Sequence, residues 1–121
     1  MSAGPRRWTV RLTAAAEADF QEILRWTLAQ FGEAQARAYA ETLSAALKAL
    51  AAGPTVTGAR ERNEIAKGLS TFHVARKGRR GRHFVVFRIG HDQGREVIEV
   101  LRVLHDSMDL QLHLPPTDES T

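Results

Sequence analysis

The sequence predicts a single α+β domain in which a pair of antiparallel helices packs against an antiparallel sheet. Apolar residues recur at helical spacing along two successive stretches of the first half, and they alternate with polar residues over residues 8–12. Two apolar, strand-like runs follow each other in the last third of the chain. At 121 residues, the chain can bury about two-thirds of its unfolded surface around one core. We therefore expect one domain over residues 8–114, with disordered termini at 1–7 and 115–121.

The first half predicts a short strand followed by a helical hairpin. Residues 8–12 alternate as a half-buried strand does, and we expect this strand at a sheet edge. Thr13 is the expected N-cap of a helix that ends at Gly32, and a second helix then runs until Gly53. Because one glycine connects two long helices, they must run antiparallel, and their shared apolar face needs a sheet to cover it.

The second half predicts a three-stranded antiparallel meander. Its expected strands are 71–76, 82–89 and 96–104, joined by glycine-bearing turns at 78–81 and 90–94. Before it, residues 55–70 predict a mobile connection with at most one irregular turn. After it, residues 106–114 predict a short C-terminal helix.

Two arginines, Arg88 and Arg102, lie among apolar residues of these strands. A guanidinium stays charged in a protein, so each must reach a carboxylate, the sheet edge or a ligand. By strict alternation, residues 98, 100, 102 and 104 share one face of the last strand, and 97, 99, 101 and 103 share the other. Glu99 therefore cannot pair with Arg102. We expect Arg102 to pair with a carboxylate elsewhere in the fold rather than to contact a substrate.

The net charge is only +3, but five of the seven residues from 76 to 82 are basic. Such a cluster attracts phosphate backbones or acidic protein segments, although a solvated hairpin turn has the same composition. We take it as the candidate target-binding surface. Its members are Arg76, Lys77, Arg79, Arg80 and Arg82.

Composition excludes several classes of protein. The chain contains no cysteine, so it has neither disulfides nor thiolate metal sites. No segment resembles a signal peptide or a membrane span, which predicts a soluble, cytoplasmic protein without a membrane partner. His105, Asp109 and His113 have the i, i+4, i+8 spacing of a helical metal site, but a short segment next to a flexible tail offers no sheltered partners to orient the ligands. We expect no metal and no cofactor.

The order of elements resembles the RelE/ParE superfamily of small bacterial toxins, over about residues 8–114. The likeness is carried by Thr13-Ala-Ala-Ala-Glu-Ala-Asp, by Gly81-Arg-His-Phe-Val-Val-Phe-Arg-Ile and, most specifically, by Val100-Leu-Arg-Val-Leu-His-Asp-Ser-Met-Asp. The last of these is similar to the ending common in ParE-like proteins. The resemblance implies the toxin of a type II toxin–antitoxin system, as in plasmid stabilization, with a cognate antitoxin as partner.

The superfamily divides by mechanism. RelE-like members resemble ribosome-dependent nucleases that cut mRNA, whereas ParE-like members are thought to poison DNA gyrase. RNA cleavage needs groups that transfer protons and cations that hold phosphate. RelE-like proteins often use a tyrosine near the C-terminus, where this chain has Met108, and the one tyrosine, Tyr39, belongs to the apolar stripe of the second helix.

We therefore expect a gyrase inhibitor with no catalytic residues, which meets DNA only through the antitoxin complex. The alternative is an endoribonuclease acting on mRNA at the ribosome with Arg82, Arg102 and His105. For His105 taken alone, an imidazole that hydrogen-bonds the backbone at a strand end is the simpler interpretation. His73 and His83 also lie in strands beside apolar neighbours and predict structural roles.

Overall fold

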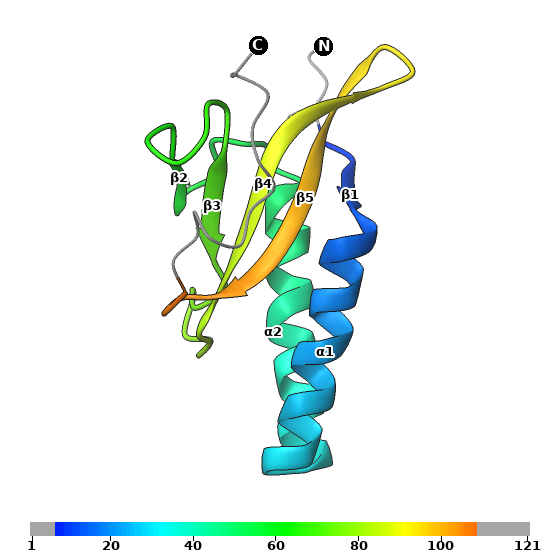
Figure 1. Ribbon diagram of the computed structural model, residues 1–121, viewed down its shortest axis with the longest axis vertical. Helices are drawn as coiled ribbons and strands as arrows, with labels where there is room; N and C mark the ends of the chain where they lie inside the picture. Colours follow the sequence, from blue (N-terminus) through cyan, green and yellow to red (C-terminus); the bar gives the residue numbers. More distant parts are fainter. Residues whose placement is uncertain (1–6, 109–121) are drawn as a thin grey trace, which may run out of the picture.

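The fold, described by a computed structural model over residues 7–108, has two helices packed on one face of a five-stranded sheet (Figure 1). The strand order across the sheet is β1-β5-β4-β3-β2. This confirms the predicted α+β class and the order of helical hairpin and meander. Of the predicted C-terminal helix, residues 109–114 lie outside the described residues, as do 1–6 and 115–121 of the expected disordered termini.

The helical hairpin forms as its local signals predict. α1 (Ala14–Phe31) and α2 (Glu33–Leu50) are each 18 residues long. The Thr13 hydroxyl accepts a hydrogen bond from the Ala16 N–H at 3.1 Å and donates one to the Leu101 carbonyl at 2.9 Å, so the N-cap also ties α1 to the sheet. Gly32 adopts a φ of +92°, which reverses the chain between the helices. Neither helix among residues 7–108 is long and apolar enough to cross a membrane.

Both edges of the sheet are three-residue strands. β1 (Val10–Leu12) pairs parallel with β5 (Arg95–His105), which confirms its predicted edge position. β2 (Ala59–Glu61) pairs antiparallel with β3 (Ser70–His73) and forms the other edge. The expectation that residues 55–70 hold no more than an irregular turn is therefore wrong. So short a strand has no alternation of its own to detect, and its pairing with β3 defines it.

The long central hairpin extends further than its sequence indicated. β4 (His83–Asp92) and β5 pair antiparallel as far as Asp92 and Arg95. Gln93 and Gly94, with φ of 52° and 79°, make the two-residue turn between them. Positive φ at both positions is the signature of a type I′ turn, which matches the twist of the strands. The predicted turn at 90–94 was too long because Gly90 stands within β4.

Two apolar clusters lie on opposite faces of the sheet. The main core, between helices and sheet, includes Phe72, Phe87 and Ile98, all at most 1% exposed. A smaller cluster on the far face joins Leu69, Val86 and Leu104. It lies beneath the segment that includes Ile65 and Ala66.

A bulge in β5 changes which side chains face the helices. Val86 pairs with Arg102 and Phe87 with Val100, so Leu101 has no opposite residue. Beyond it, Val103 joins the core on the helix side and Leu104 the far cluster. The predicted faces of these two residues are therefore wrong, because strict alternation fails across an inserted residue.

Candidate functional site

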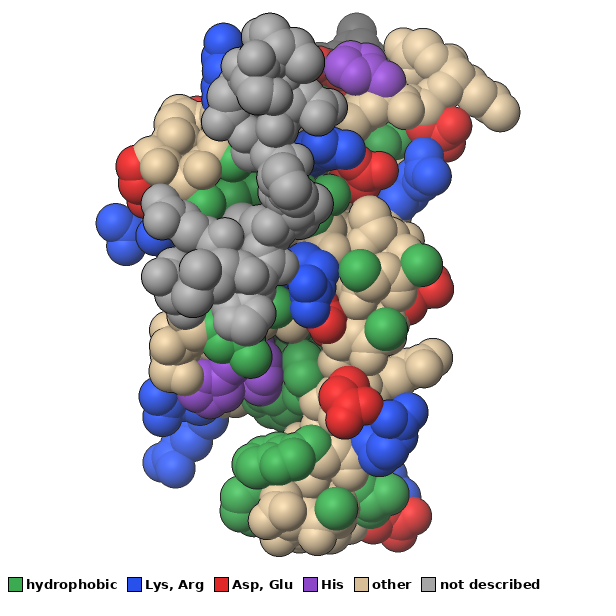
Figure 2. All heavy atoms as spheres, in the orientation of Figure 1, with side chains coloured by type: hydrophobic (Ala, Val, Ile, Leu, Met, Phe, Trp, Pro, Cys, Tyr) green, Lys and Arg blue, Asp and Glu red, His purple; other side chains and the backbone are tan. Residues whose placement is uncertain are grey.

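The helical hairpin extends past the end of the sheet (Figure 1). An open groove of about 1210 Å³ lies between the hairpin and the sheet. Its apolar wall comes from the hairpin, where Trp26 and Phe31 are 57% and 60% exposed and pack edge to face. Its other wall comes from the strand ends and from the turn before β4, including Arg79 and Arg80. Figure 2 shows the apolar end of the hairpin, with basic and histidine side chains across the hollow from it.

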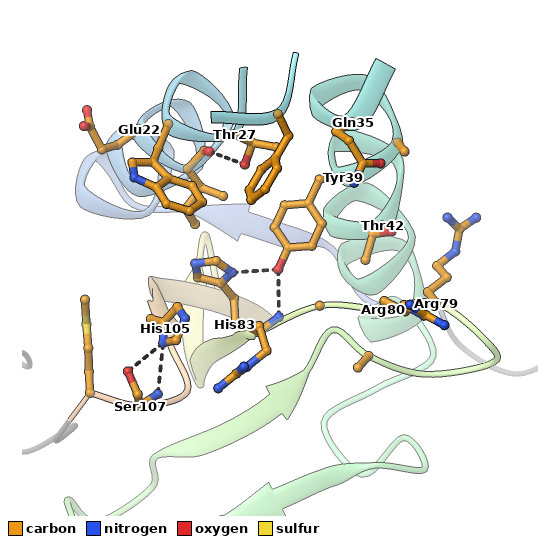
Figure 3. Close-up of a pocket in the computed structure, with 18 residues that line it drawn as sticks. Glu22, Thr27, Gln35, Tyr39, Thr42, Arg79, Arg80, His83, His105 and Ser107 are labelled. Carbon is orange, nitrogen blue, oxygen red and sulfur yellow. Dashed lines mark hydrogen bonds between the residues drawn. The ribbon is translucent and has the colours of Figure 1, made fainter. Parts of the chain in front are cut away.

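Tyr39 and His83 make the shortest polar contact in this groove. The Tyr39 hydroxyl lies 2.6 Å from Nδ1 of His83 and 3.1 Å from the backbone nitrogen of Arg82, as the dashed lines of Figure 3 mark. The Arg82 N–H donates to the hydroxyl, and the tautomer of His83 decides whether the hydroxyl or Nδ1 is the donor of the 2.6 Å contact. The contact fastens α2 to the start of β4.

Burial controls the protonation of this pair. Desolvation, followed by the neighbouring charge of His105, lowers the pKa of His83 from 6.5 to about 4. Desolvation likewise raises the pKa of Tyr39. Both side chains are consequently neutral near pH 7. A base with so low a pKa is a poor acceptor for a substrate proton at neutral pH.

Asp106 joins the ends of three strands. His73 Nε2 lies 3.0 Å from its carboxylate, and Arg82 Nε lies 3.2 Å from it. The Ala75 N–H donates to Nδ1 of His73, so Nε2 carries the proton that His73 gives to Asp106. These partners, His73 first, lower the pKa of Asp106. An ionised carboxylate therefore fixes the direction in which the chain leaves β5.

The sequence and the fold both match one family of known proteins. The model of the ParE toxin of the type II toxin–antitoxin system parDE matches residues 10–110. The chain belongs to this family. Toxin ParE of Escherichia coli is 34% identical over 103 residues, which cover 85% of this chain and 89% of that protein. Toxin ParE1 of Caulobacter vibrioides is 32% identical over 104 residues, or 86% and 95% of the two chains.

Solved structures agree on the ParE fold. A chain of the chromosomal ParDE toxin–antitoxin system from P. aeruginosa superposes with a TM-score of 0.67 at 18% identity, covering 83% of this chain and 97% of that one. A chain of the toxin–antitoxin complex RelBE2 from Mycobacterium tuberculosis gives a TM-score of 0.50 at 26% identity, with coverages of 82% and 98%. The family model and the curated relatives confirm the resemblance to ParE-like toxins, and the solved structures share its fold.

In this ParE toxin, the three residues of the nuclease alternative do not meet. Arg82 and His105 line the groove, whereas Arg102 does not. Nε and Nη2 of Arg102 donate to the two carboxylate oxygens of Asp19 on α1, at 2.7 and 2.9 Å. This confirms the expected internal partner of Arg102. Arg88 in turn pairs with Glu99 across the strands at 2.9 Å.

The basic turn, which we define as residues 76–82, forms only part of the groove wall. Arg79, Arg80 and Arg82 line the groove, whereas Arg76 and Lys77 do not. The guanidinium of Arg76 lies over the ring of Phe72 at 5.1 Å. The turn thus offers cations both to the groove and to the solvent beyond it.

Sequence reasoning missed the Tyr39–His83 pair, although it named both residues. It placed Tyr39 in the apolar stripe, where its ring does pack against the core, but the hydroxyl reaches beyond that core to the groove. The two residues are 44 positions apart, and no local pattern joins them. Gly81 lies so close to the Tyr39 hydroxyl that a larger residue would crowd it. A single glycine in a basic turn does not reveal this contact from the sequence.

Proposed function

We propose that this ParE-type toxin inhibits growth by binding a macromolecular target, DNA gyrase, rather than by catalysis, and that a cognate antitoxin neutralises it. Membership of the ParE family supports the toxin role. The named relatives in toxin–antitoxin systems support the antitoxin partner. We propose the cytoplasm as its compartment.

The observation that carries this proposal is the arrangement of the titrating and cationic side chains. Arg102 is held by Asp19 outside the groove, and Asp106 holds Arg82. His83, an imidazole that lines the groove, has its pKa lowered by desolvation to about 4. RNA cleavage needs a proton acceptor and cations directed at one phosphate. The described residues use these groups to join strands and helices instead.

The groove suits the antitoxin. An amphipathic helix laid into it would cover Trp26 and Phe31, and carboxylates along its edge would meet Arg79 and Arg80. Trp26 and Phe31 are exposed and in contact with each other, and contiguous exposed apolar side chains mark surfaces that bind other proteins. The outer side of the helical hairpin, together with the basic turn, is the proposed target-binding surface.

A gyrase supercoiling assay tests the proposal directly. The purified toxin is expected to block supercoiling and to accumulate cleaved DNA, and equimolar antitoxin is expected to restore activity. A His105→Ala variant should retain full inhibition, because this imidazole has no catalytic duty in the proposal. In cells, DNA damage signalling and filamentation should precede any loss of mRNA.

The endoribonuclease alternative retains one point in its favour, because His105 and Arg82 both line the groove. Nδ1 of His105 accepts a hydrogen bond from the Ser107 N–H at 3.1 Å, so the ring proton of the neutral imidazole lies on Nε2. If ribosome-bound mRNA is cut by the wild type and not by His105→Ala, with gyrase unaffected, the alternative is correct and the gyrase proposal is wrong.

A further inference from the structure

We propose that the basic turn and the outer face of α2 together bind the sugar–phosphate backbone of duplex DNA, without reading its sequence. This goes beyond the expectation that the toxin meets DNA only through its antitoxin complex. It concerns the toxin alone and shares its surface with the proposed target-binding site, but its test uses no gyrase, so the two proposals can fail separately.

The first argument is the lack of carboxylates around the turn. Arg82, at its end, is paired with Asp106. Lys77, Arg79 and Arg80 are exposed, and none has a carboxylate within ion-pair distance among residues 7–108. Lys77 has a φ of 53° and Gly78 a φ of 82°, and the Arg79 N–H closes the turn onto the carbonyl of residue 76. A tight, hydrogen-bonded turn therefore holds three solvent-facing cations close together.

The second argument is the placement of Arg79 against α2. With Arg37 and Lys48 of that helix it lines a shallow hollow of about 540 Å³, in which Ser44 supplies a hydroxyl. Glu41 is the one carboxylate among the hollow's lining residues, although Arg37 also pairs with Glu33 at 3.7 Å. Cations from two elements, with a hydroxyl between them, match the donors that contact phosphates in DNA complexes.

The third argument is what the hollow lacks. Its remaining lining residues are Ala40 and Ala45. Binding of single strands relies on aromatic side chains on which bases stack, and the aromatic residues of this region line the other groove. An acidic protein partner would need large apolar anchors beside the charges; the groove offers Trp26 and Phe31 to the antitoxin, whereas the hollow has only two alanines. A site that offers cations and a hydroxyl, but no aromatic or large apolar side chains, is best suited to binding the sugar–phosphate backbone of a duplex.

Fluorescence anisotropy with a labelled 20-base-pair duplex tests the inference, with the full chain purified free of antitoxin. Binding should fall linearly on a log–log plot against KCl from 20 to 200 mM, with a slope of about −0.9 per cation engaged. Two duplexes of unrelated sequence should bind alike. The double variant Arg79→Gln/Arg80→Gln should reduce the slope by about 2 and weaken binding at 50 mM KCl about a hundredfold.

The matched control, Lys67→Gln/Arg95→Gln, removes the same charge from exposed positions elsewhere. It should change affinity less than threefold, while Arg79→Lys/Arg80→Lys should largely restore binding. Circular dichroism confirms that each variant is folded. Equal losses in the control, the absence of a salt slope, tighter binding of a single strand, or equal competition by polyglutamate would each overturn the inference, the last in favour of an acidic protein partner.

Discussion

Asp19→Ala tests how α1 is held on the sheet. The Asp19 carboxylate accepts two hydrogen bonds from Arg102 and a third, at 2.9 Å, from the Val103 N–H. Breaking a buried ion pair from one side costs about 3–5 kcal/mol, and a backbone donor adds about 1. The two side chains retain 29% and 16% exposure, so water recovers part of this. We expect the free energy of unfolding to fall by about 3 kcal/mol.

Urea denaturation of the full chain, followed by circular dichroism, measures this loss as a fall of the midpoint by about 2 M. Glu99→Ala is the matched control, because it removes a carboxylate from Arg88, whose side chain is 57% exposed. Its expected cost is below about 1 kcal/mol. The double variant Asp19→Leu/Arg102→Met, which leaves no buried charge, should recover most of the stability. If Asp19→Ala costs no more than Glu99→Ala, the pair does not hold α1.

Three further perturbations test the groove and its floor. Burial lowers the pKa of His83 from 6.5 in the unfolded chain to about 4 in the folded one, so its contribution to stability is complete above pH 6.5 and is lost as the pH falls toward 4. At pH 5.5 we expect a loss of at most about 1 kcal/mol, because solvent screens this half-buried imidazole, and urea titrations of His83→Gln should lack it. Gly81→Ala should cost about 1–3 kcal/mol in the same assay, since its methyl would overlap a buried valine, whereas Gly90→Ala should stay within about 1 kcal/mol; equal costs would contradict this. Alanine at both Trp26 and Phe31 should leave stability within about 1 kcal/mol yet weaken antitoxin binding about tenfold or more by calorimetry, and unchanged affinity would place the antitoxin elsewhere.

The elements that the sequence predicted well are those with local signals. Thr13 caps α1 and Gly32 separates the helices because caps and positive φ depend on the residue itself. The two long strands were recognisable because each carries enough apolar residues to cover a core. β2 was not recognisable, because a strand of three residues has no detectable alternation and is defined only by its pairing with β3. The bulge at Leu101 was not recognisable either. An inserted residue leaves the strand just as apolar, but it reverses which face of the sheet each later side chain occupies.

The candidate site divides in the same way. Physical chemistry required partners for Arg88 and Arg102, and both have them, but only the packing of α1 on β5 identifies Asp19. The basic turn was evident because its charges are consecutive. The contact between Tyr39 and His83 was hidden, since it joins a helix to a strand across 44 residues.

The long-range contacts explain why a toxin with several titrating residues in one groove is proposed to bind rather than to cleave. Asp19 joins α1 to β5, Tyr39 joins α2 to β4, and Asp106 joins the ends of β3 and β4 to that of β5. Each is a contact on which the packing of the helices or the strand ends depends. A catalytic group must change its protonation or its partner during turnover, and doing so here would loosen the fold. Lys77, Arg79 and Arg80 have no such duty, so they remain available to partners of opposite charge.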